Sequence, residues 1–304
     1  MRRRRSKLLS GLLATLAVLL LGASSAQVSG RIFTSHAEPV SLLAARPTAV
    51  TSVPAVVTPP PVNFTALANK ATAAAQVSGA DMSLALLDRQ TGRLVTSGDK
   101  APFPIASVAK LFIADDMLIQ AAQRKSPLTA GDRHLLETML RSSDDWAADE
   151  FWSRDGGNAV IKRVAARYHL TSTTVPYDGN WWNTMSTTTD LVRYYTMLLD
   201  GSGGLPRPQA DLMLANLAAS SPLGADGYPQ RFGIPDGLFA EPVAVKQGWM
   251  CCWNGPNWLH LSTGVIGADR RYVMAVASMQ PVDDATARNT VTQALKTMFP
   301  AGRI

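Results

Sequence analysis

The chain has 304 residues, 46% of them hydrophobic, and it carries a formal net charge of +6. Five of its positive charges lie at residues 2–5 and 7, and leaving them out reduces the net charge to about +1. A nearly neutral remainder excludes the strongly basic surface typical of nucleic-acid-binding proteins, so we expect no nucleic-acid partner.

The first 26 residues predict a secretory signal peptide. The basic residues precede an uncharged run at residues 8–21, and small residues follow up to Ala26, near which we expect cleavage. The run is shorter than the roughly 20 apolar residues of a membrane span, so membrane contact would come only from an uncleaved signal. No cysteine follows the run, which argues against a lipid anchor. The sequence therefore predicts an exported protein, extracellular or in the cell envelope or periplasm.

Residues 27–62 predict a proline-rich linker. Such a segment buries too little apolar surface to offset the entropy cost of ordering it. Six prolines interrupt its Ser, Thr, Ala and Val background: Pro39, Pro47, Pro54, Pro59, Pro60 and Pro61. The remaining residues, 63–304, are enough for one domain with a sizeable core.

The predicted domain begins with a hairpin and continues into helices. Residues 82–97 contain two alternating runs joined by the turn signal Arg-Gln-Thr-Gly. A buried helix is predicted over residues 107–123, because residues 108–114 are apolar on nearly every face except at Lys110. Further helical patterns cover residues 129–141, 143–153, 157–170, 187–200 and 206–219.

The pattern then returns to strands. Residues 242–248, 258–266 and 271–279 predict strands separated by Asn-Gly-Pro and Gly-Ala-Asp turns, and an amphipathic helix follows at residues 284–298. This order predicts an α+β fold, with an antiparallel sheet carrying flanking helices and an all-helical lobe at about residues 107–240.

Ser107 and Lys110 form a candidate catalytic pair. They lie three residues apart at the start of the predicted helix and share a face, so the amine can reach the hydroxyl. Burial lowers the pKa of a lysine and makes a neutral general base available, and a helix N-terminus favours negative charge on the serine oxygen. A second S-x-x-K pattern, at residues 97–100, falls in a turn and is not expected to be catalytic.

Two more motifs follow in the chain. Ser143-Asp144-Asp145 lies in the helical region, and the chain's only K-x-G pattern, at residues 246–248, lies on a predicted strand. Together with the serine–lysine pair they resemble the S-x-x-K, S-D-N and K-T-G set of class A β-lactamases and of the penicillin-binding serine hydrolase superfamily. The resemblance extends over nearly all of residues 63–300 and implies a β-lactamase/transpeptidase-like fold.

The resemblance assigns catalytic roles to four side chains. It implies that Ser107 attacks a carbonyl carbon and that Lys110 accepts the serine proton. It also implies that Ser143 passes a proton to the leaving group and that Lys246 polarises this relay and pairs with a substrate carboxylate.

A substrate-binding strand and an oxyanion hole are implied as well. Lys246, Gln247 and Gly248 correspond to the strand that binds substrate. The backbone N–H groups of Ser107 and Trp249 correspond to the oxyanion hole.

Three departures from the family pattern bear on activity. Asp145 replaces an asparagine, and a carboxylate close to Lys110 would favour the charged ammonium. Gln247 replaces a threonine. No glutamate lies where the family has its deacylating base, and Asp178 is the one carboxylate in residues 171–189 that remains as a candidate for orienting water.

Structural interpretations compete with the catalytic ones. In this interpretation Ser107 caps a helix while Lys110 extends to solvent. Ser143 caps another helix, and Lys246 protects a sheet edge against aggregation. Five tryptophans are consistent with the wall of a cleft, but packing in the core or against the sheet is the preferred interpretation: Trp181, Trp182, Trp249, Trp253 and Trp258. Adjacent cysteines such as Cys251 and Cys252 rarely bridge, although export places them in oxidising surroundings.

Three functions are consistent with the sequence. One is an acyl hydrolase or transferase that forms an acyl-enzyme with D-alanyl peptides, related amides and esters, or β-lactams. The others are a weak β-lactamase and a catalytically degenerate protein that binds the cell wall. We expect a monomer acting on peptidoglycan peptide or β-lactam, without cofactor or metal, since the histidines are scattered: His36, His134, His169 and His260.

Overall fold

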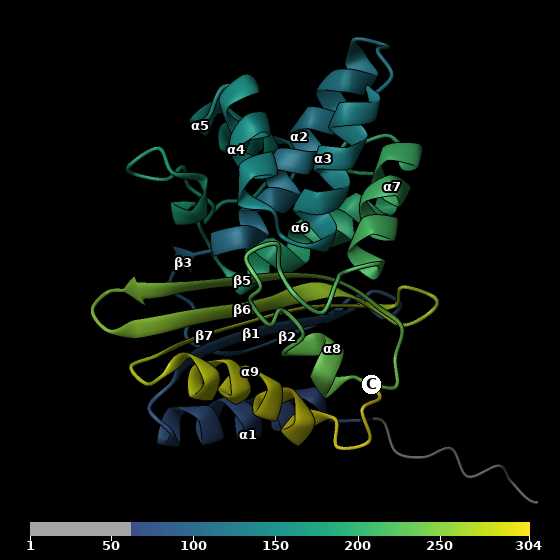
Figure 1. The fold of residues 1–304 in the computed structure, drawn as a ribbon. Coiled ribbons are helices and arrows are strands. Elements are labelled where there is room, and N and C mark those ends of the chain that lie inside the picture. Colours follow the sequence, from purple (N-terminus) through teal and green to yellow (C-terminus); the bar gives the residue numbers. More distant parts are fainter. Residues whose placement is uncertain (1–61) are drawn as a thin grey trace, which may run out of the picture. The chain divides into compact units, whose positions relative to one another are not determined.

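The computed structural model describes residues 62–304, so the predicted signal peptide and nearly all of the predicted linker lie outside the described residues. A five-stranded antiparallel sheet with the strand order β2-β1-β7-β6-β5 forms its middle layer (Figure 1). The strands are β1 (Asp81–Asp88), β2 (Arg93–Gly98), β5 (Val243–Trp253), β6 (Asn257–Ile266) and β7 (Tyr272–Gln280).

One face of the sheet is covered by helices from both ends of the domain (Figure 1). They are α1 (Phe64–Val77), α9 (Asp284–Met298) and the short α8 (Ile234–Gly237). Fully buried side chains such as Leu84, Val276 and Leu295 fill the space between these helices and the sheet. Their burial ties the two ends of the described chain to one layer.

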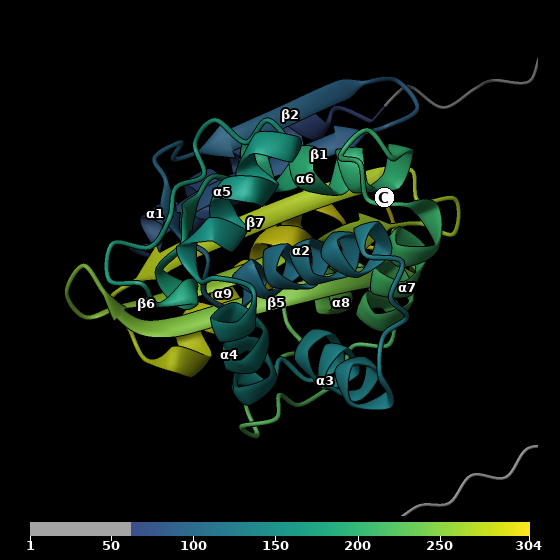
Figure 2. The same ribbon diagram turned by 90° about the horizontal axis from the view of Figure 1, so that it is seen from above.

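The other face carries a lobe of helices (Figure 1). Its segments are η1 (Ala106–Ala109), α2 (Lys110–Gln123), α3 (Ala130–Arg141), α4 (Asp145–Arg154), α5 (Asn158–Arg167), η2 (Trp181–Asn183), α6 (Thr188–Asp200) and α7 (Arg207–Ala218). A two-stranded ribbon joins β3 (Phe103–Pro104) to β4 (Met185–Ser186). Viewed from the lobe side, α2 lies across the middle with α3, α4, α5 and α7 around it (Figure 2).

A buried carboxylate fixes α2 within the lobe. Asp115 accepts hydrogen bonds from Arg167, from Tyr168 and, at 3.3 Å, from the hydroxyl of Tyr194. A buried charge is tolerated only when it is paired and hydrogen-bonded, as this one is. The network therefore anchors the helix that carries Lys110.

The predicted α+β architecture is confirmed, and the differences are local. Helix α1 is not among the predicted elements, α8 is also new, and β5 continues five residues past the predicted end at 248. Within residues 62–304 no helix is both long and apolar enough to cross a bilayer.

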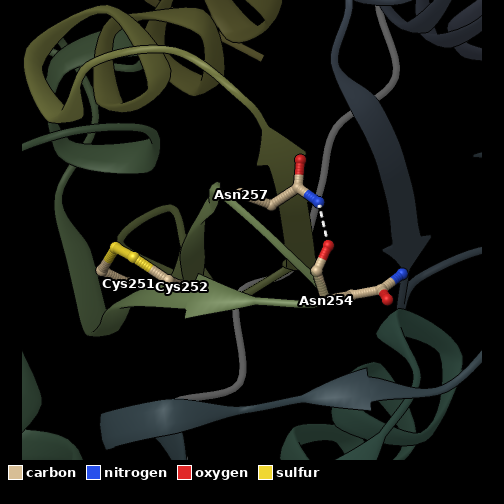
Figure 3. Close-up of a disulfide and its surroundings, with 4 residues drawn as sticks. All are labelled: Cys251, Cys252, Asn254 and Asn257. Atoms are coloured by element: carbon tan, nitrogen blue, oxygen red, sulfur yellow. Dashed lines mark hydrogen bonds between the residues drawn. A yellow bond between two sulfur atoms is a disulfide. The ribbon is translucent and has the colours of Figure 1, made fainter.

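The extension of β5 carries the two cysteines. Cys251 and Cys252 are joined by a disulfide bond near the exposed end of the β5–β6 hairpin (Figure 3). Strand pairing shifts register between Cys251 and Trp253, and Asn257 Nδ2 donates to the carbonyl oxygen of Asn254 at 2.8 Å across the turn. The structure therefore bridges a pair whose adjacent positions in the sequence argued against a disulfide.

Candidate active site

Ser107 lies in a tight 3-10 turn directly before α2. The preceding Ala106 has φ of 46°, an uncommon value for a non-glycine residue, and the Val108 N–H bonds to the carbonyl oxygen of Ile105 at 2.9 Å. The helix predicted from Ser107 therefore begins as a 3-10 turn at Ala106–Ala109 and becomes α-helical from Lys110.

The side chains of Ser107 and Lys110 meet as predicted. Lys110 Nζ donates to Ser107 Oγ at 2.8 Å. The lysine has no exposed surface and the serine is 7% exposed. A lysine extending to solvent is thereby excluded, and η1 has no side-chain cap. Burial lowers the pKa of Lys110 below its usual 10.5, because water no longer stabilises the ammonium.

Ser143 lies between α3 and α4 and contacts both lysines of the site. Its carbonyl oxygen accepts from Lys110 Nζ at 2.7 Å, and its Oγ accepts from Lys110 Nζ at 3.3 Å and from Lys246 Nζ at 2.7 Å. The cap of α4 is Asp144, whose carboxylate accepts from the Trp146 N–H at 2.9 Å. Ser143 is therefore free of a capping role and is held between the lysines.

Lys246 projects from β5 into the same cluster. Its side chain is buried, with 1% exposure, so it does not protect the sheet edge from solvent-side pairing. Burial lowers its pKa well below 10.5, and the neighbouring Lys110 lowers it further, while Asp145 and Asp226 oppose this effect. The two lysines, 136 positions apart in the sequence, thus share one serine.

Asp145 forms an ion pair with Lys110. The Oδ1 atom lies 2.5 Å from Lys110 Nζ, while the carboxylate side chain is 71% exposed. The carboxylate raises the pKa of Lys110 and opposes the larger effect of burial, which is the competition expected from the sequence. The pKa of Lys110 therefore lies below its usual value, but Asp145 limits how far it falls.

Gly248 is required by packing. A Cβ atom at this position would lie 2.8 Å from the carbonyl oxygen of Ile105 and 3.4 Å from the Cβ of Ala106. Only glycine allows β5 to approach the turn that carries the candidate nucleophile. This close approach also brings the next residue, Trp249, to the site.

Gln247 does not reach the site. Its side chain is 1% exposed and its Nε2 donates to the carbonyl oxygen of Phe232, a core residue on the α8–α9 side of the sheet. Successive side chains of a strand point to opposite faces, so Gln247 faces away from the cluster that Lys246 joins. The structure therefore places the Gln247 side chain outside the cleft, and any contact of this residue with substrate stays a prediction for its backbone.

A cleft opens beside Ser107 with a volume of about 180 Å³. It is lined by Ala106, Ser107, Asp145, Trp181, Trp182, Asp226, Trp249 and Met250. Three of the five tryptophans for which the sequence favoured core or sheet packing thus form its wall. Among these, Trp181 has its ring centroid 4.5 Å from Lys110 Nζ.

Asp178 is absent from the cleft lining. It is exposed, its Oδ1 accepts from the Asn180 N–H at 3.1 Å, and its Oδ2 accepts from the side-chain amides of Asn180 and Asn183, both at 2.8 Å. Burial is the largest single influence on the pKa of Asp178 and raises it, but these hydrogen bonds together lower the pKa below 3.8. The carboxylate stabilises its own turn, and the structure does not bring it to the other predicted residues.

Asp226 is the charged cleft residue that the sequence did not reveal. It lies in the loop after α7, and the Ala225 N–H bonds to the carbonyl oxygen of Ser142 at 2.6 Å. This bond places Asp226 next to the Ser143 loop, although 83 positions separate them in the sequence. No motif spacing signals such a contact. In the described part of the chain, no cluster of three or more His, Cys, Asp or Glu residues has metal-binding geometry.

The fold is similar to that of solved β-lactamases, whereas no protein-family model matches the sequence. A β-lactamase from Chitinophaga pinensis has a TM-score of 0.63 with 16% identity, covering 80% of this chain and 100% of that chain. PBP-A has a TM-score of 0.64 with 17% identity over 78% of this chain and 96% of its own. The architecture is therefore that of the class A β-lactamases and of PBP-A.

Closer sequence relatives come from mycobacteria. The proteins named "Putative lipoprotein LppW" in Mycobacterium bovis and Mycobacterium tuberculosis are 58% identical over 270 residues, covering 88% of this chain and 85% of theirs. The chain belongs to the LppW family.

Proposed function

We propose that this protein is an exported serine acyl hydrolase or transferase of the penicillin-recognising type, with Ser107 as its nucleophile. The observation that carries the proposal is the 2.8 Å bond from the buried Lys110 Nζ to Ser107 Oγ. An amine depressed in pKa and in contact with a hydroxyl is the arrangement that general-base activation of serine requires.

The acylation step transfers one proton and exchanges one bond. Ser107 Oγ forms a bond to the substrate carbonyl carbon while its proton passes to neutral Lys110. The bond from that carbon to the leaving nitrogen or oxygen breaks, and Ser143 delivers a proton to the leaving atom. Contacts of Ser143 Oγ with Lys110 and Lys246 support a route for replacing that proton. The product is an ester on Ser107.

The backbone N–H groups of Ser107 and Trp249 are the proposed oxyanion hole. The packing of Gly248 against residues 105 and 106 supports this assignment, because it brings the backbone of β5 against the serine turn. Each such donor contributes a factor of roughly 10²–10³ to the rate.

The proposed acyl-enzyme is long-lived. Hydrolysis requires a base that contacts a water molecule facing the ester. Asp178 is held in its own turn outside the cleft lining, and Asp145 is paired with Lys110. D-alanyl peptides of the cell wall and β-lactams are the proposed acyl donors. Transfer of the acyl group from Ser107 to an amine, in place of water, would be the alternative way to release it.

One observation favours a second candidate, a non-catalytic protein that binds the cell wall. Asp145 stabilises the protonated form of Lys110 at 2.5 Å, which opposes its use as a base. Burial remains the larger influence on the pKa of Lys110 and favours the neutral amine. For this reason we prefer the catalytic function to the non-catalytic one.

Export to the cell envelope is part of the proposal. It is supported by the signal-like residues 1–26 and by the lipoprotein name of the mycobacterial relatives. The two cysteines of this chain are Cys251 and Cys252, so its own sequence offers no cysteine for lipid attachment near residue 26.

Labelling with a fluorescent penicillin, followed by intact-mass spectrometry, tests the proposal. We expect one covalent adduct per chain and, with nitrocefin, a burst near one equivalent followed by slow turnover. A chain that binds peptidoglycan fragments but never acquires an adduct would support the non-catalytic candidate. Rapid steady hydrolysis would instead identify an efficient β-lactamase.

A further inference from the structure

The cleft beside Ser107 is small and its charged lining residues are acidic. Its volume of about 180 Å³ is below the roughly 300–1,000 Å³ of sites that enclose a whole small molecule, so it accommodates the end group of a longer ligand. The two charged residues that line it are Asp145 and Asp226, and both are exposed. Lys110 and Lys246 lie behind the wall with exposures of 0% and 1%.

The rest of the wall is aromatic. Trp182 and Trp249 are half-buried and line the cleft together with Met250. An indole attracts a cation through the negative potential of its ring face, and such contacts strengthen as water is excluded. Indoles beside two carboxylates form a wall that is complementary to a positive charge on the acyl side of a donor, whereas the carboxylate on the leaving-group side of a D-alanyl peptide or β-lactam would pair with Lys246.

Asp226 is held in a defined position. Its Oδ1 accepts from the Tyr228 N–H at 2.9 Å, and the Gly224 N–H bonds to the Tyr228 carbonyl oxygen at 2.8 Å. The Tyr228 ring stacks on Trp249 at 4.4 Å between centroids, and its hydroxyl lies 2.8 Å from His260 Nε2. In residues 62–304 Asp226 forms no ion pair within 4 Å; its charge raises the pKa of Lys110 and Lys246 behind the wall, and its exposed carboxylate remains open to a ligand in the cleft.

We infer that this cleft selects acyl donors that carry an ammonium or guanidinium group close to the reacting carbonyl. The inference rests on the proposed function, since it names the class of substrate that Ser107 would attack. A peptide with a basic side chain next to its scissile bond has this chemistry. Exposed ion pairs and indole contacts together predict acylation roughly tenfold faster for a cationic donor than for a neutral one, with an anionic donor slower still.

Three p-nitrophenyl esters of equal chain length test the inference. Their acyl chains end in a trimethylammonium, a methoxy or a sulfonate group. Acylation forms the Ser107 ester and releases p-nitrophenol, which absorbance measures, and intact mass confirms the adduct. We expect the rate order cationic, neutral, anionic.

The chain contains a matched control for Asp226. The tripeptide Gly-Ala-Asp occurs at residues 224–226 and again at residues 267–269, where Asp269 Oδ1 accepts from the Arg271 N–H at 3.1 Å in an equivalent turn. Asp226→Asn keeps the turn-forming oxygen and should reduce the preference for the cationic ester by roughly threefold to fivefold. Asp269→Asn should leave all three rates unchanged.

The outcomes separate this inference from the proposed function. Equal rates for the three esters, or faster reaction of the sulfonate, overturn the inference while leaving acylation intact. An equal slowing of all three esters in Asp226→Asn also overturns it, because the carboxylate would then act on a common step. If no ester forms an adduct, the proposed function fails. Indole NMR titrations of Ser107→Ala with matched unreactive amides then test the charge preference alone, and equal shifts for the cationic and anionic amides overturn it.

Discussion

The chain contains the pattern S-x-x-K twice, and the two copies have different surroundings. Ser97, at the end of β2, lies 2.7 Å from the hydroxyl of Thr72 and donates to Asn69 Oδ1 at 2.8 Å, while Lys100 is exposed. Ser107 contacts Lys110, which is fully buried. In the first copy Gly98 has φ of 79°, so the serine and lysine do not follow one helical face. The serine and the lysine meet only in the second copy, where the helical turn brings them together and the lysine is removed from water.

The largest expected effect comes from removing each serine in turn. Ser107→Ala should abolish the penicillin adduct, because the attacking oxygen is lost. Ser97→Ala should leave the adduct intact, since its hydroxyl bonds to Thr72 and Asn69 of α1 and not to the candidate site. Intact-mass spectrometry of the two variants measures this directly, and an adduct retained on Ser107→Ala would falsify the nucleophile assignment.

An intermediate effect is expected from replacing Asp145, the aspartate that is paired with Lys110. Asp145 raises the pKa of Lys110, so Asp145→Asn should lower that pKa and leave more neutral amine at pH 7. The rising limb of the pH–rate profile for acylation should move about one pH unit towards acid, with roughly tenfold faster acylation at pH 7.

Asp99→Asn is the matched control for this change, because Asp99 adjoins the exposed Lys100 of the copy at residues 97–100. Its pH–rate profile should superimpose on that of the parent protein. An unchanged or slower Asp145→Asn variant would indicate that the carboxylate orients Lys110 more than it restrains the loss of its proton.

The smallest effect is expected at Asp178. Asn at this position changes the charge of a turn outside the cleft lining, so the rate of acyl-enzyme hydrolysis should change by less than about twofold. The decay of the adduct followed by mass gives that rate. A collapse of turnover in Asp178→Asn would restore this residue as the deacylating base.

The sequence was sufficient for the elements with strong periodicity and for the motif residues that meet. The hairpin at β1 and β2, the lobe helices and the contact of Lys110 with Ser107 all follow from local pattern. Helix α1, which is rich in alanine and directly follows the predicted linker, was not among the predicted elements.

The missed parts of the site have two physical causes. Gln247 was placed in the site by motif position, although strand alternation turns it away from the face of Lys246. Asp226 reaches the cleft through one backbone bond between distant loops, and no local pattern encodes that contact. Local periodicity predicts elements, whereas the neighbours of a loop depend on how the whole domain packs.

The bond from Lys246 to Ser143 connects the two layers that build the site, because Lys246 belongs to the sheet and Ser143 to the lobe. Sliding one layer against the other by an ångström would break this bond while every helix and strand stayed intact. If the proposed acylation occurs, the rate of penicillin labelling would therefore report how well the lobe and the sheet are aligned. During gradual denaturation it would register their separation before circular dichroism detects any loss of helix.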